Sequence, residues 1–345
     1  MSRTHGLAIL VALGTTAGCR SSTGTFSPGD AAAAAADRGP AAGDSALESD
    51  GPSPTPEAAA DRSVVADRGG ADHTATGADT SRPDSGAAPD GGGARCKRGI
   101  ATNTAPSGAF APSATSPGVS WWYNWSSKPA ASSLEFVPMV WGSGSLKDAL
   151  PADARYVLGF NEPNFKSQAN LTPPQAAAAW PSIEAHAQAA GIPIVSPGMN
   201  FCGSSSSPSG CSDPQITDPY TYLKAFLAAC PSCEVDYVAV HWYNCDLPSL
   251  KAYIEGNLDT GGGLEGFVQF GKPIWVTEFS CDTSHSVADQ KVFMQSAVPY
   301  LENNPHIYRY SWFSASPIPN ARLANDDGTL TELGTVYVGL PANCQ

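Results

Sequence analysis

Residues 156–164 (YVLGFNEPN) and residues 273–280 (PIWVTEFS) share one pattern, a short apolar run that leads into a glutamate. The glutamate is Glu162 in the first segment and Glu278 in the second. Short runs of β-branched and aromatic residues predict strands, and runs that are almost wholly apolar are typical of a parallel sheet covered by helices. We therefore expect two buried parallel strands, each of which ends at a glutamate.

Six further runs of this kind bring the expected strands to eight. The eight expected strands, with the two already described among them, are residues 97–101, 119–123, 135–141, 156–161, 194–197, 235–241, 274–278 and 307–313. Helical stretches follow the later strands, at residues 173–190, 218–229, 247–255 and 288–301. Alternating strands and helices predict a parallel sheet, and eight such strands predict an α/β fold of the (β/α)₈ TIM barrel type. Residues 102–117 show little helical period, so the pattern is weakest in the first two units.

Composition changes abruptly near residue 95. Residues 21–95 consist mainly of Ala, Gly, Asp, Ser, Pro and Thr, with no aromatic residue after Phe26, whereas all eight Trp and all eleven Tyr come later. A stretch of that composition cannot bury enough apolar surface to offset its ordering entropy. We expect a disordered linker over residues 20–95 and one folded catalytic domain over residues 96–345.

The first residues resemble a bacterial lipoprotein signal. Arg3 and His5 precede a short apolar run, and small residues then lead to Cys19, although Thr16 stands where such signals usually have Leu. We expect a signal peptide over residues 1–19, lipid attachment at Cys19, and export to the cell envelope or outer surface. The apolar run is too short to span a bilayer, so the lipid would be the membrane anchor and residues 20–95 its tether. Plain secretion is the alternative.

The cysteine count fits an oxidising compartment. Nine cysteines are present, and lipidation of Cys19 would leave eight, an even number. Sequence alone leaves the connectivity open. Nearness in the sequence, strand position and closure of the domain ends suggest four pairs: Cys96 with Cys344, Cys202 with Cys211, Cys230 with Cys233, and Cys245 with Cys281. The third pair has the spacing of a thioredoxin-like redox pair, but it follows a predicted helix instead of opening one, which favours a local disulfide.

The formal net charge of −13 argues against a nucleic-acid partner, because phosphate binding needs a basic face. Much of the acidity lies in the expected linker, where a solvated, self-repelling segment explains it. A monomer is expected. A lone histidine at a strand end, His241, has no second His or Cys at ligand spacing, so we expect no metal and no organic cofactor.

Glu162 and Glu278 carry the expected chemistry. The carboxyl ends of barrel strands form one mouth, which is where this fold places its active sites. Hydrolysis of a glycosidic bond needs one protonated carboxyl group and one ionised carboxylate, and a second carboxylate with partial burial raises the pKa of one partner. The alternative is that each glutamate ends its strand in a structural ion pair. Two such glutamates among aromatic residues, with few Lys or Arg nearby, favour catalysis.

Further polar and aromatic residues surround the expected mouth. His241 and Tyr243 lie on the same side of the sixth strand, where they are expected to orient a carboxylate. Aromatic residues gather at the ends of the second and third strands: Trp121, Trp122, Tyr123, Trp125 and Trp141. Such rings can stack on sugars, and the alternative for about half of them is a place in the core.

Several ordered motifs resemble glycoside hydrolase family 128, a family of β-1,3-glucanases. They are residues 97–101, 120–125, 136–141, 158–164, 236–243 and 275–279, so the likeness covers essentially residues 97–313. The resemblance implies a retaining barrel enzyme with Glu162 as acid/base and Glu278 as nucleophile. It also implies sugar-binding roles for Asn161, His241, Tyr243, Trp312, Asn124, Trp125 and Trp141, with Trp312 on the floor of the subsite beside the cleaved bond. The long linker, the Ser-rich insertion at residues 203–210 and the extra cysteines depart from the family pattern.

The expected function is that of an exported endo-β-1,3-glucanase, with β-glucan as its partner. A retaining enzyme requires its two carboxyl groups about 5–5.5 Å apart. One alternative is a retaining glycosidase for another β-glycan, because barrels with such a pair act on many substrates. Others are a non-catalytic glucan-binding lipoprotein of the cell surface and a structural lipoprotein.

Overall fold

The computed structural model of the chain describes residues 96–204, 206–256, 265–315 and 317–344. The expected signal peptide, the lipidation site Cys19 and the linker up to residue 95 lie outside these residues. Within the described ranges, no helix is both long enough and apolar enough to cross a membrane.

All eight expected strands are present. They are β1 (Arg98–Ala101), β2 (Trp121–Tyr123), β3 (Glu135–Phe136), β4 (Val157–Leu158), β5 (Ile194–Val195), β6 (Val238–Tyr243), β7 (Ile274–Ser280) and β8 (Ile307–Phe313). The bounds of β8 agree with the prediction, whereas β3, β4 and β5 are two residues each, much shorter than their apolar runs. Strands β6 and β7 extend two residues further than expected, to Tyr243 and Ser280.

In the part of the chain that the structure describes, five α-helices accompany the strands: α1 (Pro173–Ala190), α2 (Pro219–Ala229), α3 (Leu247–Glu255), α4 (Val287–Asn303) and α5 (Glu332–Gly339). The sequence predicted the first four and missed α5. Helix α4 begins at a capping box, in which the Asp289 amide donates to Ser286 Oγ and the Ser286 amide donates to Asp289 Oδ2. The connections from β1 to β4, all of them described, contain only short 3₁₀ turns, as the weak helical period of residues 102–117 indicated.

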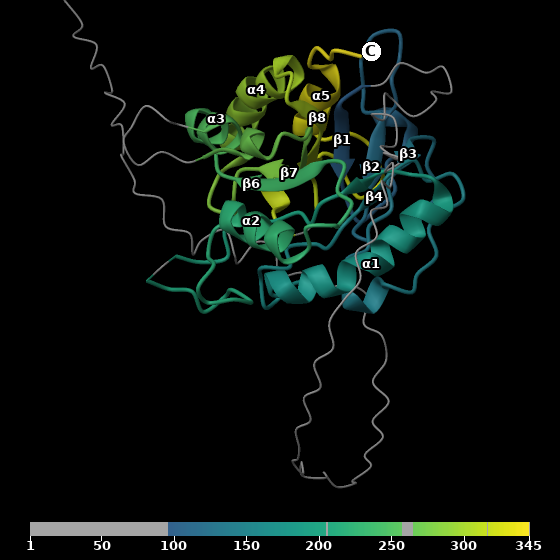
Figure 1. Cartoon of the computed structure of the whole chain (residues 1–345). Coiled ribbons are helices and arrows are strands. Elements are labelled where there is room, and N and C mark those ends of the chain that lie inside the picture. Colours follow the sequence, from purple (N-terminus) through teal and green to yellow (C-terminus); the bar gives the residue numbers. More distant parts are fainter. Residues whose placement is uncertain (1–95, 205, 257–264, 316, 345) are drawn as a thin grey trace, which may run out of the picture.

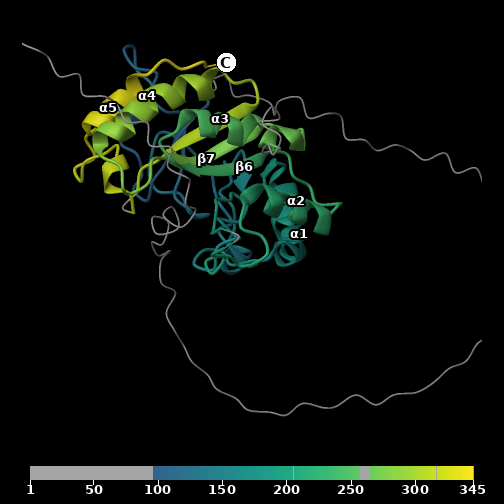
Figure 2. The same ribbon diagram turned by 90° about the vertical axis from the view of Figure 1, so that its left-hand side faces the viewer.

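Every strand pairing is parallel, which makes this an α/β fold with a parallel sheet. Six strands form one sheet in the order β3-β2-β1-β8-β7-β6, and β4 pairs with β5. Isolated parallel bridges between Met139 and Leu158 and between Val195 and Tyr237 join the pair to the segments beside β3 and β6. Figure 1 shows α1 and α2 on one side of the strands and α3, α4 and α5 on the other. The turned view in Figure 2 shows the same arrangement, with β6 and β7 between the two groups of helices.

Two large clusters make up most of the core of the described residues. Trp121, Tyr123 and Trp275 belong to the smaller cluster, which lies on the face away from the helices. Trp122 and Val276, their direct neighbours in sequence, belong to the larger cluster together with the buried residues of the helices. This is the alternation of a strand that is covered on both faces.

The structure contains all four expected disulfides: Cys96–Cys344, Cys202–Cys211, Cys230–Cys233 and Cys245–Cys281. The first disulfide joins the two ends of the described part, and the backbones of the same two cysteines also form an antiparallel bridge. The last joins the loops that follow β6 and β7. A short link between these loops restricts their motion relative to each other.

Candidate active site

Glu278 lies on β7, where a bulge turns its side chain. Val276 and Phe279 both belong to the core cluster beside the helices, although three positions separate them. Regular alternation would place residues an odd number apart on opposite faces. A register shift between these two residues resolves the conflict, because a bulge adds one residue to the strand. Glu278 therefore faces away from the helices and pairs with His241 of β6.

Three neutral donors hold the Glu278 carboxylate. The hydroxyl of Tyr123 donates to Oε1 at 3.0 Å, and the indole Nε1 of Trp125 donates to the same oxygen at 2.7 Å. The hydroxyl of Tyr243 donates to Oε2. Burial raises the pKa of both tyrosines well above the usual value, and the negative charge of Glu278 adds to this effect. Both hydroxyls therefore keep their protons and act as donors that orient an ionised carboxylate.

Glu162 has a different environment. It follows β4 with a φ of 39°, a left-handed conformation that a non-glycine residue rarely adopts. Its amide donates to the carbonyl of Gly198 at 2.7 Å, which holds this turn beside the loop after β5. The side chain is completely buried, Oε1 contacts His241 Nδ1 at 2.9 Å, and Oε2 has no hydrogen-bond partner among the described residues.

The electrostatics separate the two glutamates. Burial raises the pKa of Glu162, the hydrogen bond and charge of His241 oppose this rise, and the charge of Glu278 supports it. The net direction is upward, which favours the protonated form. Glu162 thus has the character of a general acid, whereas three neutral donors surround the carboxyl group of Glu278.

His241 joins the two carboxylates. Its Nδ1 lies 2.9 Å from Glu162 Oε1 and 3.3 Å from Glu278 Oε2. Burial acts to lower the pKa of His241, but the charge of Glu278 and the hydrogen bond to Glu162 outweigh it, so the pKa is raised. On the other side of the ring, a Cβ on Gly198 would lie 2.7 Å from Nε2. Only glycine leaves room for the imidazole in this position.

These three side chains also form a potential cation site. One ligand atom from each of Glu162, His241 and Glu278 lies within 4.8 Å of the others, and a group of this kind can hold a metal ion. The oxygens of Glu278, however, already accept hydrogen bonds from two tyrosines and one indole. A metal ligand would have to give up these donors, so the arrangement suits an organic substrate better.

A disulfide loop supports the segment after Glu162. Phe165 pairs with Cys211 in an antiparallel bridge, and these two residues form a small buried cluster with Cys202. The Lys166 amide donates to the carbonyl of Gly210 at 2.9 Å. The Ser-rich insertion that departs from the family pattern therefore contacts the loop of one candidate catalytic residue.

The predicted sugar-binding residues lie at different distances from this pair. Asn161 is buried directly before Glu162, and its Oδ1 has no partner among the described residues. The backbone amide of Asn161 donates to the backbone carbonyl of Trp141, which places the half-buried Trp141 at the same mouth. Asn124 donates to the carbonyl of Lys128 at 3.1 Å, in the turn that also carries Trp125. The indole of Trp125 donates to the carboxylate of Glu278, and its contact with sugar stays a prediction.

The structure corrects the prediction for Trp312. This residue is completely buried, and its indole donates to the carbonyl of Ala321 at 2.8 Å. It pairs with Ile100 of the larger cluster, whereas Phe313 pairs with Ala101 of the smaller cluster on the opposite face. It therefore does not line the site. The strand-eight aromatic at the mouth is Phe313, whose ring lies 5.5 Å from that of Trp125 and 5.3 Å from that of Tyr243. The alternation of β8 was the signal that identifies Phe313, because adjacent strand residues face opposite sides.

Among the described residues, neither Glu162 nor Glu278 forms an ion pair with Lys or Arg, and the titratable base beside both is His241. The alternative, in which each glutamate ends its strand in a structural ion pair with Lys or Arg, is therefore not what the described residues show. Two buried carboxyl groups without a fixed cation remain, beside aromatic rings and an unpaired amide oxygen.

Comparison with known proteins gives a family model, described as the glycosyl hydrolase catalytic core, that matches residues 99–337. One similar solved structure is a glycoside hydrolase family 128 (subgroup II) endo-β-1,3-glucanase from Sorangium cellulosum. It is 41% identical, with a TM-score of 0.57, over 71% of this chain and 99% of that one. A second enzyme of the same description, from Pseudomonas viridiflava, is 36% identical, with a TM-score of 0.56, over 71% and 98% of the two chains.

A curated relative is alkali-sensitive linkage protein 1 of Schizosaccharomyces pombe, which is 29% identical over 258 residues. The match covers 70% of this chain but 44% of the relative, so the chain spans less than half of that protein's length.

Proposed function

The chain belongs to the glycosyl hydrolase catalytic core family, and within it to glycoside hydrolase family 128, and on this premise we propose that it is a retaining endo-β-1,3-glucanase. It is a glycoside hydrolase, and its relatives support hydrolysis of β-1,3-glucan. The endo mode rests on the two subgroup II enzymes, both of which are described as endo-β-1,3-glucanases.

One observation carries the mechanism: two buried carboxyl groups meet at one mouth in opposite electrostatic surroundings. Ligand oxygens of Glu162 and Glu278 lie within 4.8 Å of each other. This close approach of one oxygen from each carboxyl group supports the retaining class, whose carboxyl groups lie about 5–5.5 Å apart, over the inverting class, whose carboxyl groups lie about 6.5–9.5 Å apart. Glu162 serves as acid/base and Glu278 as nucleophile.

The reaction then has two steps. An electron pair of Glu278 forms a bond to the anomeric carbon while the bond to the leaving oxygen breaks, and Glu162 gives its proton to that oxygen. Glu162 next takes a proton from water, whose oxygen attacks the same carbon and releases Glu278. Asn161, with its unpaired Oδ1, is placed to accept a hydrogen bond from a sugar hydroxyl beside the reacting centre.

Two further proposals concern the architecture. Residues 96–345 form one (β/α)₈ catalytic domain, and the bridges from Met139 to Leu158 and from Val195 to Tyr237 support closure of the eight strands. Residues 1–95 supply a signal, a lipid anchor on Cys19 and a linker that displays the domain at the cell surface. The four disulfides support this second proposal, because they use eight of the nine cysteines and leave Cys19.

The test is to incubate the purified protein with linear β-1,3-glucan and to resolve the products. A ladder of oligosaccharides is expected from an endo enzyme, and the first-formed products should keep the β configuration when followed by proton NMR. Cellulose, xylan and mannan, incubated in parallel, test the alternative of another β-glycan. Binding of β-1,3-glucan without any hydrolysis would replace this proposal with that of a glucan-binding protein.

A further inference from the structure

Both lone pairs of one oxygen of Glu278, Oε1, are occupied. A carboxylate offers about four lone-pair sites on its two oxygens. Oε1 accepts from Tyr123 and Trp125, and Oε2 accepts from Tyr243 and lies 3.3 Å from His241 Nδ1. The side chain is 2% exposed. Attack on an anomeric carbon needs a free electron pair, so Oε1 can attack only after one of its two donors has been released.

Trp125 is the contact that is easiest to release. Tyr123 belongs to β2, while Tyr243 and His241 belong to β6, and the side chains of all three are buried. Trp125 lies in the turn after β2, is half-buried, and has a φ of 58°. This left-handed conformation is unfavourable for a bulky side chain, so a change of the turn would relieve backbone strain.

The surroundings of Trp125 leave its indole on the edge of the mouth. Its ring packs against Tyr123 at 5.3 Å and Phe313 at 5.5 Å between centroids. Both contacts are edge-on or tilted, with interplanar angles of 60° and 65°. Two rings therefore pack against Trp125, and its N–H donates to Oε1 of Glu278.

We propose that Trp125 is a gate on the nucleophile: its indole N–H covers Oε1 of Glu278 in the free enzyme and leaves this oxygen when a glucan chain enters. This inference rests on the proposed function, since it requires Glu278 to be the nucleophile. Oε1 is then the attacking oxygen, and Oε2 keeps its contacts with Tyr243 and His241 during the reaction. The released indole is available to the incoming sugar, and relief of the backbone strain offsets part of the lost hydrogen bond.

The kinetic test compares the pH profiles of the wild type and Trp125→Phe, a variant that keeps an aromatic ring but has no N–H. The acid limb of the kcat/KM profile reports the pKa of the essential base in the free enzyme, and the acid limb of the kcat profile reports that pKa in the substrate complex. Loss of a donor to a carboxylate in the free enzyme should move the acid limb of kcat/KM upward by about one pH unit, which is a tenfold change. The acid limb of kcat should stay in place.

Trp141→Phe is the matched control, because Trp141 is half-buried at the same mouth but is not one of the donors to Glu278. Neither acid limb should move in this variant. If the acid limbs of kcat/KM and kcat move together in Trp125→Phe, the indole stays hydrogen-bonded to the carboxylate during catalysis, and the proposed gate is contradicted. If neither limb moves, the hydrogen bond has no effect and the gate is equally wrong.

A second measurement follows the native tryptophan. Protein with Glu162→Gln and 5-fluorotryptophan should bind a laminarioligosaccharide without cleaving it, and the resonance that Trp125→Phe removes assigns Trp125. That resonance should shift on binding, and an unchanged resonance at saturation would overturn the gate. A wild type with no hydrolysis would instead overturn the proposed function, so the two failures are distinguishable.

Discussion

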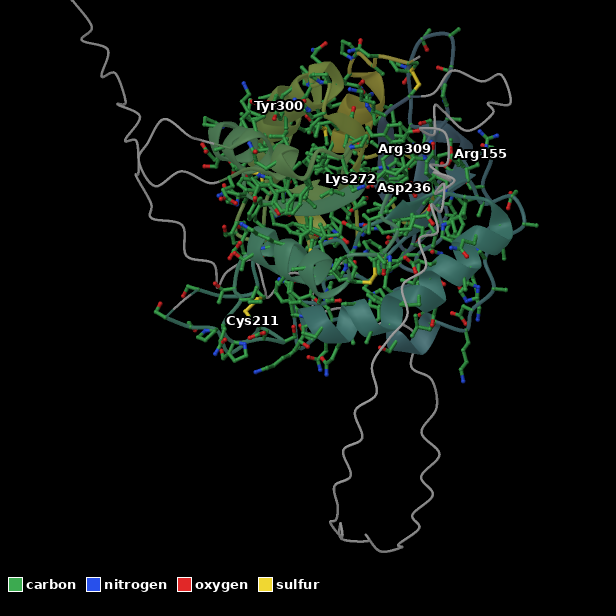
Figure 3. The ribbon with its side chains drawn as sticks, in the orientation of Figure 1. Arg155, Cys211, Asp236, Lys272, Tyr300 and Arg309 are labelled. Atoms are coloured by element: carbon green, nitrogen blue, oxygen red, sulfur yellow. A yellow bond between two sulfur atoms is a disulfide. The ribbon has the colours of Figure 1, made fainter. Side chains whose placement is uncertain are left out.

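Two carboxylates on the strands, Glu135 and Glu278, have opposite kinds of partner. The guanidinium of Arg309 donates to both oxygens of Glu135 at 2.9 Å. It also packs against the rings of Tyr156 and Trp275, at 4.6 Å and 5.0 Å from their centroids. Figure 3 labels Arg309, which pairs with Trp275 near the start of β7, and Glu135 is the first residue of β3, so this ion pair lies toward the end where the strands begin. Glu278, nearer the opposite end, has only neutral donors and one histidine.

The difference separates a structural carboxylate from a reactive one. Burial acts to lower the pKa of Arg309, but the charge of Glu135 outweighs it, so the pKa is raised and the guanidinium stays charged. Its fork takes both carboxylate oxygens in fixed geometry. Tyrosine and indole donors orient Glu278 without neutralising its charge, which leaves that charge for the reaction.

Loss of either glutamate that we propose as catalytic should have the largest effect. Glu278→Gln and Glu162→Gln each remove a group to which we assign a role at the reacting bond, so kcat on β-1,3-glucan should fall by about 10³-fold or more. Both variants should fold, since amide and carboxyl groups have nearly the same size. Glu135→Gln is the matched control, and its folded fraction should keep most of the activity. Comparable loss of kcat in all three variants would contradict the distinction between the two carboxylates.

Loss of Arg309 from its ion pair with Glu135 should lower the stability of the protein. Arg309→Met leaves the carboxylate of Glu135 without its partner in a mostly buried position, which should lower the free energy of unfolding by about 3 kcal/mol. Urea denaturation followed by tryptophan fluorescence measures this change. Lys291→Met is the control, because Lys291 pairs with the exposed Glu332 and its loss should leave stability nearly unchanged. An Arg309→Met protein as stable as the wild type would contradict a structural role.

Removal of one neutral donor should have an intermediate effect on the rate. Tyr243→Phe keeps the ring but removes the hydroxyl that donates to Glu278 Oε2, and a hydrogen bond to a charged group contributes about 1.5–3 kcal/mol. We expect kcat/KM to fall by about 10- to 100-fold. Tyr222→Phe removes a buried hydroxyl that donates to the carbonyl of Leu171, away from the carboxylates, and provides the control. Equal kinetics in both variants would show that the Tyr243 hydroxyl has no part in the reaction.

A change in the pH profile should be the smallest effect. Glu162 must be protonated to act as the acid, and its pKa is raised above the usual value, so activity should persist above that value and fall as the pH rises through the raised pKa. The hydrogen bond and charge of His241 act to lower this pKa. His241→Ala should therefore move the alkaline limb of kcat/KM to higher pH. A limb that moves to lower pH would contradict the assigned direction.

Much of the fold was accessible from the sequence. The eight apolar runs predicted eight strands, and nearness or strand position predicted the four disulfides. The bounds of β3, β4 and β5 were not accessible, because an apolar run records burial and not the hydrogen bonds that define a strand. Helix α5 was missed, although its sequence begins after Thr331, whose side chain accepts from the Gly334 amide as an N-cap.

The sequence by itself determined which groups were available: two glutamates after apolar runs, a histidine and a tyrosine two positions apart, and aromatic residues beside them. Only the tertiary structure decided how these groups meet. The donors to Glu278 come from β2, the turn after it and β6, more than 30 positions away in sequence for the nearest of them. The bulge in β7 decided which way Glu278 points, and alternation in β8 placed Phe313 at the site instead of Trp312. The physical reason is that a one-residue shift in a strand reverses its faces, and that shift depends on the neighbouring strands.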